Sequence, residues 1–407
     1  MAEGAGMNAI AKGFLVGAAA LAMTPVRASD HLDSPAVIAD PRADIGDVYA
    51  WMSPDARRLN LVMTIVGHSF SDRLAYVFHI ESGRRFGRTT ATIDLTCRFV
   101  SATQTDCRLG KLDRAQGDAS QAKGIGSDGG RFRIFTGLRD DPFFNNVRGT
   151  RAAYNRAVKA LGSDGSHYDA AGCPTFTRGQ SAQILDEWHQ TDGGPATNLL
   201  RGWTPDSIIV SIDVAAVNKD GPLLAVWAAT VGPREQIDRA ARPLTGNALL
   251  ATLGTDAESD ALKIRYNRAS PKAGAKFVAD IARGVALYDG FDGQCGDSLL
   301  AHQPARPSQR YWPLTRLLAD DRLWVNSQSG ICTQLFAVER AALNGEIDLA
   351  GDCGGRTISY DSVNIYRSLL ANGTIHGIDD GVHNDEKLHS TTEFPFVAAP
   401  DGIVPGR

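Results

Sequence analysis

The sequence has no surplus of basic residues, because 42 Lys and Arg face 46 Asp and Glu and the formal net charge is -4 at pH 7. Proteins that bind nucleic acid through its phosphates usually carry a basic surplus on one face. We therefore expect no nucleic-acid partner. The hydrophobic fraction of 43% and the charged fraction of 22% are close to globular averages, so the chain can bury a core.

No apolar run is long enough to span a bilayer as a helix, which takes about 20 residues, so we expect no transmembrane anchor. The apolar segment 13–23 follows a lysine, precedes Pro25 and leads to the tripeptide Val-Arg-Ala at 26–28. This order is typical of a secretory signal peptide with a small-residue cleavage site. We predict a signal peptide at residues 1–28 and a soluble, periplasmic or secreted mature chain that starts at Ser29.

The sequence also lacks the common catalytic and metal-binding motifs. It contains no H-E-x-x-H, Walker, EF-hand or C-x-x-C sequence. Glycines 124, 126 and 129 have the spacing of a dinucleotide fingerprint, but an expected strand follows them where the fingerprint needs a helix. The sequence G-H-S-F-S at 67–71 is similar to a nucleophile elbow but lacks its second glycine. We therefore expect neither a Rossmann nucleotide site nor a serine hydrolase.

All six cysteines follow the expected cleavage site. An even number of cysteines in an exported chain favours disulfides, although six thiols allow 15 pairings. Cys97 and Cys107 flank a polar turn and suit a bridged hairpin, and Cys332 lies close to Cys353 in sequence. Elimination leaves Cys173 with Cys295. The alternative is a set of free, buried thiols.

Hydrophobic periodicity predicts both strands and helices. Alternation of apolar and polar residues predicts half-buried strands at 59–66, 93–99 and 131–134, and the Gly-, Asp- and Ser-rich segment 115–130 between them predicts a loop. Continuous apolar runs at 207–214 and 223–230 predict strands in the middle of a sheet. Helical spacing with start or stop signals predicts helices at 154–161, 270–285 and 359–372.

Strands early in the chain and helices late, without strict alternation, indicate an α+β fold. We expect a mainly antiparallel, β-sandwich-like core with helical insertions and a helical C-terminal part. The sequence has no internal repeat and no low-complexity tail, so we expect residues 29–407 to form a single large domain.

Four blocks of sequence are spread over the expected mature chain. They are S-D-H-L-D-S-P at 29–35 with A-D-I-G-D-V-Y-A at 43–50, F-T-G-L-R-D-D-P-F-F at 135–144, Q-I-D-R-x-x-R-P-L at 236–244, and D-D-G-V at 379–382 with F-P-F at 394–396. In this order they resemble a family of secreted bacterial proteins that is classified as a domain of unknown function. The resemblance implies export and one architecture for the whole mature chain, and it implies no activity, cofactor or catalytic residue.

The expected mature N-terminus is a candidate copper site. Cleavage before Ser29 would leave the chain starting Ser29, Asp30, His31, with a free amine, two backbone amides and an imidazole. These four nitrogens can surround Cu²⁺ or Ni²⁺ in the square-planar arrangement that both ions accept. The alternative is that His31 is an ordinary surface or packed residue.

The R-D-D-P-F-F block is a second candidate site. Arg139 can hold one carboxylate in a bidentate pair, which leaves Asp140 or Asp141 free to bind a hard cation such as Ca²⁺. Asn145 and Asn146 add neutral oxygens. The alternative is a buried Arg/Asp pair that fixes a loop.

The C-terminal segment is the third candidate site. Carboxylates near two glycines suit an irregular oxygen-ligand loop for Ca²⁺, and two histidines add nitrogen ligands for a transition metal. The alternative is a hydrated acidic loop held by the aromatic residues that follow. The titratable residues are Asp379, Asp380, His383, Asp385, Glu386 and His389.

These patterns favour an exported binding or envelope protein with a Ca²⁺-like site and a Cu²⁺ site at the mature N-terminus. The alternative is a metal-dependent hydrolase or oxidoreductase with a carboxylate and histidine centre. The spacing does not assemble a nucleophile, a base and an orienting partner, so catalysis stays undecided. A shared cleft that contains Asp140, Asp141, Asp380 and His383 would favour the enzyme. The substrate or partner is not defined by these patterns.

Overall fold

Two antiparallel β-sheets form the centre of this computed structural model, which describes residues 34–162, 167–250, 256–301 and 306–401. One sheet has five strands, in the order β1 (Ile45–Met52), β2 (Arg58–Ile65), β11 (Asp206–Asp213), β8 (Phe132–Leu138) and β7 (Ile125–Gly126). The other has seven strands, in the order β13 (Gln236–Ala240), β12 (Leu223–Val231), β3 (Ala75–Gly83), β4 (Ala91–Phe99), β5 (Gln104–Leu109) and β6 (Asp113–Asp118), with β14 (Leu323–Asn326) also on β12. A small ribbon pairs β9 (Gln190–Thr191) with β10 (Gly194–Pro195).

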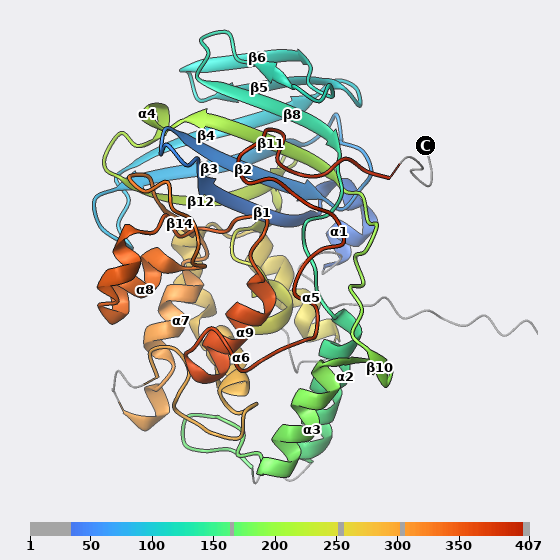
Figure 1. The fold of residues 1–407 in the computed structure, drawn as a ribbon, viewed down its shortest axis with the longest axis vertical. Helices are drawn as coiled ribbons and strands as arrows, with labels where there is room; N and C mark the ends of the chain where they lie inside the picture. The colour runs from blue at the N-terminus through green and yellow to red at the C-terminus, as the bar shows by residue number, and fades with distance from the viewer. Residues whose placement is uncertain (1–33, 163–166, 251–255, 302–305, 402–407) are drawn as a thin grey trace, which may run out of the picture.

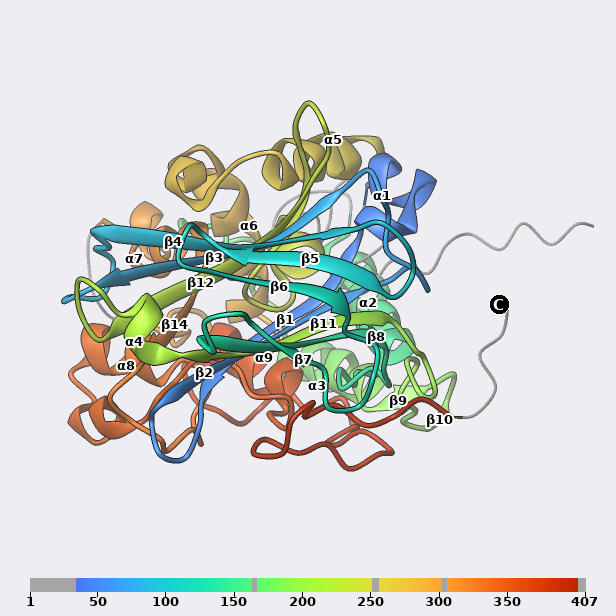
Figure 2. The same ribbon diagram turned by 90° about the horizontal axis from the view of Figure 1, so that it is seen from above.

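The two sheets lie in two layers, which Figure 2 shows from above. Most helices gather at the other end of the molecule, below the sheets in Figure 1. The prediction of an α+β fold with a mainly antiparallel, sandwich-like core is therefore confirmed. The α-helices are α1 (Pro35–Ala39), α2 (Val147–Leu161), α3 (Arg178–Trp188), α4 (Val214–Val217), α5 (Asp256–Asn267), α6 (Val278–Asp289), α7 (Trp312–Ala319), α8 (Ala337–Asn344) and α9 (Ser362–Asn372). The 3₁₀ helices are η1 (Pro41–Ala43), η3 (Pro271–Phe277), η4 (Pro307–Gln309) and η5 (Ile347–Gly351), and η2 (Thr245–Leu250) is a π-helix.

The apolar runs in the sequence form the central strands. Strand β11 pairs with both β2 and β8, and β12 pairs with both β3 and β13, as their continuous apolar sequences predict. The expected helix start at Pro271 is a short 3₁₀ helix, η3, that leads into α6. The expected stop of α9 is confirmed, because Gly373 follows it in the left-handed conformation with φ of 72°.

The expected loop at 115–130 is wrong in part, because β6 extends into it and β7 lies within it. These short strands have little pattern of their own and are held by their partners β5 and β8. The carboxylate of Asp113 adds to this, since it accepts hydrogen bonds from the Ser127 hydroxyl and from the backbone N–H groups of Gly129 and Arg131. The local sequence does not predict strands that are stabilised mainly by hydrogen bonds to partner strands distant in sequence.

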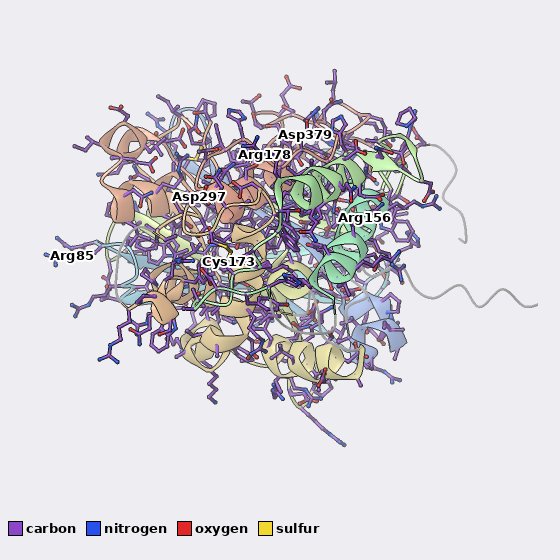
Figure 3. The ribbon with its side chains drawn as sticks, turned by 90° about the horizontal axis from the view of Figure 1, so that it is seen from below. Arg85, Arg156, Cys173, Arg178, Asp297 and Asp379 are labelled. Carbon is purple, nitrogen blue, oxygen red and sulfur yellow. A yellow bond between two sulfur atoms is a disulfide. The ribbon has the colours of Figure 1, made fainter. Side chains whose placement is uncertain are left out.

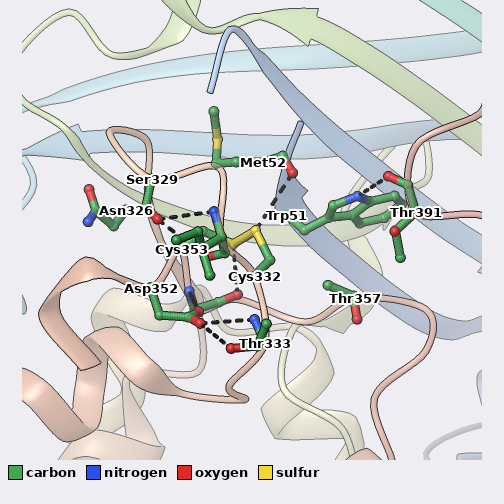
Figure 4. The surroundings of a disulfide bond; sticks show 12 residues. Trp51, Met52, Asn326, Ser329, Cys332, Thr333, Asp352, Cys353, Thr357 and Thr391 are labelled. Atoms are coloured by element: carbon green, nitrogen blue, oxygen red, sulfur yellow. Dashed lines mark hydrogen bonds between the residues drawn. A yellow bond between two sulfur atoms is a disulfide. The ribbon is translucent and has the colours of Figure 1, made fainter. Parts of the chain in front are cut away.

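All three predicted disulfides are present. Cys97 and Cys107 face each other across β4 and β5, Cys173 is bonded to Cys295, and Cys332 is bonded to Cys353. Figure 4 shows the last bond beside Met52, with Asp352 accepting hydrogen bonds from the backbone N–H and the hydroxyl of Thr333. Four of the six bonded cysteines are buried in the core, namely Cys97, Cys107, Cys173 and Cys353.

The C-terminal segment after α9 returns to the five-stranded sheet, as the red trace in Figure 1 shows. The indole N–H of Trp51 in β1 donates to the carbonyl of Thr391 at 2.9 Å. The guanidinium of Arg133 in β8 lies 5.5 Å from the ring centroid of Phe394. Residues 374–401 thus connect the helical end to the sheet. Within the described ranges, no helix is long and apolar enough to cross a membrane.

Candidate cation-binding site

The loop after β8 and the C-terminal segment meet at a group of carboxylates. The backbone N–H of Asp140 donates to the carbonyl of Ala398 at 3.1 Å, which joins the two segments. One side-chain oxygen or nitrogen from each of Asp140, Asp385 and His389 lies within 4.8 Å of the other two. Three of the ten residues predicted as metal ligands therefore come together, from segments that are distant in sequence.

Asp140 is the unusual member of this group. Its side chain is 1% exposed, and its one close cationic contact among the described residues is the ammonium group of Lys387, 3.2 Å from Oδ1, while Oδ2 accepts no hydrogen bond from them. Burial and the neighbouring Asp385 carboxylate raise the pKa of Asp140 to about 7. A buried, ionised carboxylate with only one such contact is costly, so this position favours either a proton or a cation.

Asp385 has the opposite environment. Burial raises its pKa, but hydrogen bonds outweigh burial and lower the pKa to about 2. The Nε2–H of His389 and the backbone N–H of Lys387 both donate to Oδ2 at 3.1 Å, and the side-chain amide of Asn198 donates to Oδ1 at 3.3 Å. Asp385 is therefore the first of the two carboxyl groups to ionise as the pH rises, and Asp140 keeps its proton to a higher pH.

The ammonium group of Lys387 is the nearest cation to Asp140. Its Nζ lies 3.2 Å from Oδ1 of Asp140 and 2.9 Å from Oδ1 of Asp401. It also donates to the carbonyl of Ala399 at 3.1 Å. One ammonium balances one of the two buried carboxylates, so Asp140 and Asp385 together keep one uncompensated negative charge when both are ionised.

The tautomer of His389 is set by its two neighbours. The backbone N–H of Ala398 donates to Nδ1 at 3.1 Å, so Nδ1 carries no proton. The other nitrogen, Nε2, faces the Asp385 carboxylate and carries the proton. A metal at Nε2 would move the proton to Nδ1, against the Ala398 donor, so His389 fits the role of an orienting donor better than that of a ligand.

Asp141 lies in a separate buried cluster with β1. It receives the backbone N–H of Phe143 at 3.1 Å. Burial and the charge of Asp47 raise its pKa well above the usual range, and the guanidinium of Arg356 opposes this effect. Arg356 is ion-paired with Asp47 and lies 4.1 Å from the Tyr49 ring centroid. Asp141 therefore belongs to a buried ionic contact between β1 and the residues before α9, apart from Asp140.

The expectation that Arg139 holds one of the two carboxylates is wrong. Its guanidinium carbon lies 4.1 Å from the ring centroid of Phe135, and its Nε has no hydrogen-bond partner among the described residues. The side chains of Arg139, Asp140 and Asp141 are all buried, so the block is buried as the sequence suggests. The Arg139 side chain packs on the aromatic ring instead, and Lys387 and Arg356 are the cations near the two carboxylates.

The remaining acids of the C-terminal segment are directed elsewhere. Asp380 is buried and accepts hydrogen bonds from the backbone N–H groups of Asn146 at 2.8 Å and Val382 at 2.9 Å. The side-chain amide of Asn364 donates to it at 3.1 Å, so Asp380 connects α9 to the start of α2. Because protein N–H groups already donate to the Asp380 carboxylate, we assign Asp380 a structural role.

Asp379 and His383 lie on the surface. Asp379, labelled in Figure 3, is near the end of α3, where His189 approaches it at 3.6 Å. His383 contacts Asp379 at 3.5 Å and Asp361 at 3.2 Å, and it is 59% exposed. Their ligand atoms do not meet those of Asp140 and Asp385 in one group. The shared cleft of Asp140, Asp141, Asp380 and His383 that would favour an enzyme is not formed by these residues.

Ser29, Asp30 and His31 lie outside the described residues, so the copper site stays a prediction. The sequence alone did not reveal Asn198, Asp401 or the carbonyl of Ala399 as neighbours of the carboxylate pair. Lys387 was visible as the single basic residue within the C-terminal acidic segment. That isolation was the one signal that could have marked it as the partner of a buried acid.

A scan of protein-family models, a search of curated proteins and a search of solved structures each find nothing that matches this chain. The fold and the site describe a disulfide-bonded α+β protein in which the loop after β8 and the C-terminal segment each contribute one member of a buried carboxylate pair. The resemblance to a secreted bacterial family stays a prediction.

Proposed function

We propose that this chain is an exported binding protein that holds a divalent cation of the Ca²⁺ type between Asp140 and Asp385. The observation that carries the proposal is the buried Asp140 carboxylate, which lies beside Asp385, contacts one ammonium group through Oδ1 and accepts no hydrogen bond from the described residues at Oδ2. Two ionised carboxylates balance one divalent cation. Carboxylate and carbonyl oxygens are also the ligands that Ca²⁺ prefers.

The hydrogen bonds of the His389 ring support a hard cation over a transition metal. Zn²⁺ and Cu²⁺ favour imidazole nitrogen, but both ring nitrogens of His389 are already used, one as an acceptor and one as a donor. Asp140 and Asp385 offer oxygen only. We therefore expect Ca²⁺ to stabilise the protein more than Zn²⁺ does at the same free concentration.

Burial favours binding over catalysis at this position. The side chains of Asp140 and His389 are 1% and 5% exposed, which keeps a substrate of ordinary size away from them. Export is proposed from the signal-peptide pattern, the family resemblance and the three disulfides, which persist in oxidising compartments. The Cu²⁺ site at the expected mature N-terminus belongs to the same proposal.

Thermal unfolding with and without Ca²⁺ tests the cation site. The measurement is made at pH 8, where Asp140 with its pKa of about 7 is mostly ionised. At a free Ca²⁺ concentration of about 100 times Kd, binding should stabilise the folded state by about 2.7 kcal/mol and raise Tm by several degrees. The Asp140→Asn variant should lose this Ca²⁺-dependent rise.

The control is Asp379→Asn, which removes an exposed carboxylate from the same segment and should keep the full Ca²⁺-dependent rise. The comparison uses the difference between Ca²⁺ and chelator for each variant, so any change in intrinsic stability cancels. Superimposable curves for the wild-type protein at millimolar Ca²⁺ and in chelator would remove the cation from the function.

A further inference from the structure

The ammonium group of Lys387 lies among oxygen atoms beside the carboxylate pair. Its ammonium nitrogen is surrounded by Oδ1 of Asp140 at 3.2 Å, the carbonyl oxygen of Ala399 at 3.1 Å and Oδ1 of Asp401 at 2.9 Å. All three neighbours are oxygen atoms, and two of them belong to carboxylates. This arrangement around one positive charge is the same type that Ca²⁺ recruits.

The pair Asp140 and Asp385 alone is too small a ligand set for Ca²⁺, which takes six to eight oxygens. The oxygens held by Lys387 supply what is missing, because removal of the ammonium group frees one carbonyl and the carboxylate of Asp401. Water can fill the remaining positions, since Asp401 is 80% exposed. The ligand set is therefore complete only after Lys387 has left it.

We propose that Lys387 is a tethered competitor, which fills the cation site with its ammonium group and must swing out before a divalent cation binds. This inference rests on the proposed cation site, and it assigns that site a built-in regulator. The lysine holds the site in a closed, metal-free form. A divalent cation binds only when its concentration is high enough to displace the ammonium group.

The surroundings of Lys387 allow this movement. Its side chain is 18% exposed and the following residue, Leu388, is 98% exposed, so the ammonium group has a path to solvent. The backbone stays in place during the movement, because the N–H of Lys387 donates to Oδ2 of Asp385 at 3.1 Å. Only the flexible side chain has to move, and this costs little beyond the loss of its three oxygen contacts.

The competition predicts a gain of affinity when the ammonium group is removed. The apparent Kd of a site is raised by the fraction of molecules that are closed, so a lysine that fills the site in nine molecules of ten weakens binding about tenfold. Lys387→Met removes the charge and keeps the length of the side chain. We expect this variant to bind Ca²⁺ about ten times more tightly than the wild-type protein.

The experiment is calorimetric titration of the full mature chain with CaCl₂ at pH 8, for the wild-type protein, Lys387→Met and Lys387→Gln. Lys111→Met serves as the matched control, because Lys111 is exposed at the turn after β5 and its loss should leave the Kd unchanged. Circular dichroism verifies that each variant is folded. The second variant keeps the test available if methionine is not tolerated at position 387.

The outcomes separate this inference from the cation site itself. A lower Kd in the position 387 variants, with no change in Lys111→Met, supports the competition. A wild-type protein that binds Ca²⁺, with variants that bind equally or more weakly, overturns the competition and leaves the cation site standing. Absence of binding in all four proteins overturns both.

Discussion

Two buried aspartates of similar exposure have opposite environments in this protein. The side chains of Asp140 and Asp380 are both 1% exposed. Asp380 accepts hydrogen bonds from two backbone N–H groups and one side-chain amide, whereas the carboxylate of Asp140 has only the ammonium group of Lys387 near Oδ1 and no donor to Oδ2 among the described residues. The number of donors, and not burial, therefore separates an aspartate that holds the fold together from one that is available to a ligand.

Asp380→Asn should destabilise the protein by about 3 kcal/mol, because an NH₂ group would face donors and leave buried groups unpaired. The loss should be the same with Ca²⁺ and with chelator, since the structure gives Asp380 no part in the cation site. Urea unfolding under both conditions measures it. Asp379→Asn, at an exposed neighbour, should change stability by less than about 0.5 kcal/mol. A destabilisation that appears only with Ca²⁺ would show that Asp380 is a ligand.

At the scale of elements, the sequence predicted best where a strand or helix carries its own pattern. β4 alternates, β11 and β12 are continuously apolar, and α9 ends at a glycine. The strand at β2 was predicted, but its expected half-burial is wrong, because β2 lies between β1 and β11 and is buried on both faces. The helix α3 was missed although Thr177 and Gln180 form a capping box, which is a readable signal. β6 and β7 could not be predicted from the sequence, because they are stabilised by pairing with β5 and β8 and have little pattern of their own.

The candidate site was predicted only in part for the same physical reason. The residue types and both segments were visible, but the choice of partners depends on how the sheets bring distant segments together. For example, the backbone N–H of Asn146 donates a hydrogen bond to the carboxylate of Asp380, which is 234 positions away in the sequence. No local spacing encodes that contact, so the separation of Asp140 and Asp385 from Asp141, Asp380 and His383 could not be inferred.

The connection after α6 carries an acidic group that is sensitive to pH. Burial, together with the charges of Asp292 and Asp289, raises the pKa of Asp297 to about 6 from its usual 3.8. The buried Oδ1 of Asp297 has no hydrogen-bond partner among the described residues. Because the folded-state pKa is raised, the folded protein binds the proton more tightly, and stability falls as pH rises from about 4 to about 6.

Asp297→Asn removes this ionisation and should stabilise the protein at pH 7.5. We expect a gain on the order of 1 kcal/mol, reduced by solvent screening because the carboxyl group is partly exposed. The gain should disappear at pH 4, where the wild-type carboxyl group is protonated in the folded state. Thermal melts at both pH values measure it, with the exposed Asp348→Asn as control. An equal gain at both pH values would contradict the ionisation argument.

At the scale of the whole molecule, the disulfides cross-link parts of very different sequence separation. Cys97 and Cys107 are separated by 10 positions within one sheet. Cys173, labelled in Figure 3, is bonded to Cys295 across 122 positions, and this bond joins the segment after α2 to the segment after α6 at the helical end. The long-range bond therefore restricts far more of the unfolded chain than the hairpin bond does.

This difference predicts the order of two double variants in urea unfolding. In the chain-entropy model, loss of the bond between Cys173 and Cys295 costs about 5 kcal/mol, and loss of the bond between Cys97 and Cys107 costs about 3 kcal/mol. Replacement of both partners by alanine also leaves a cavity, and this cost is larger for Cys97 and Cys107, because both are buried whereas Cys295 is only half-buried. The cavity cost opposes the order set by chain entropy, and we expect the chain-entropy order, with the larger loss for the pair Cys173 and Cys295. A larger loss for the hairpin pair would show that packing, rather than restriction of the unfolded chain, is the main contribution of these bonds.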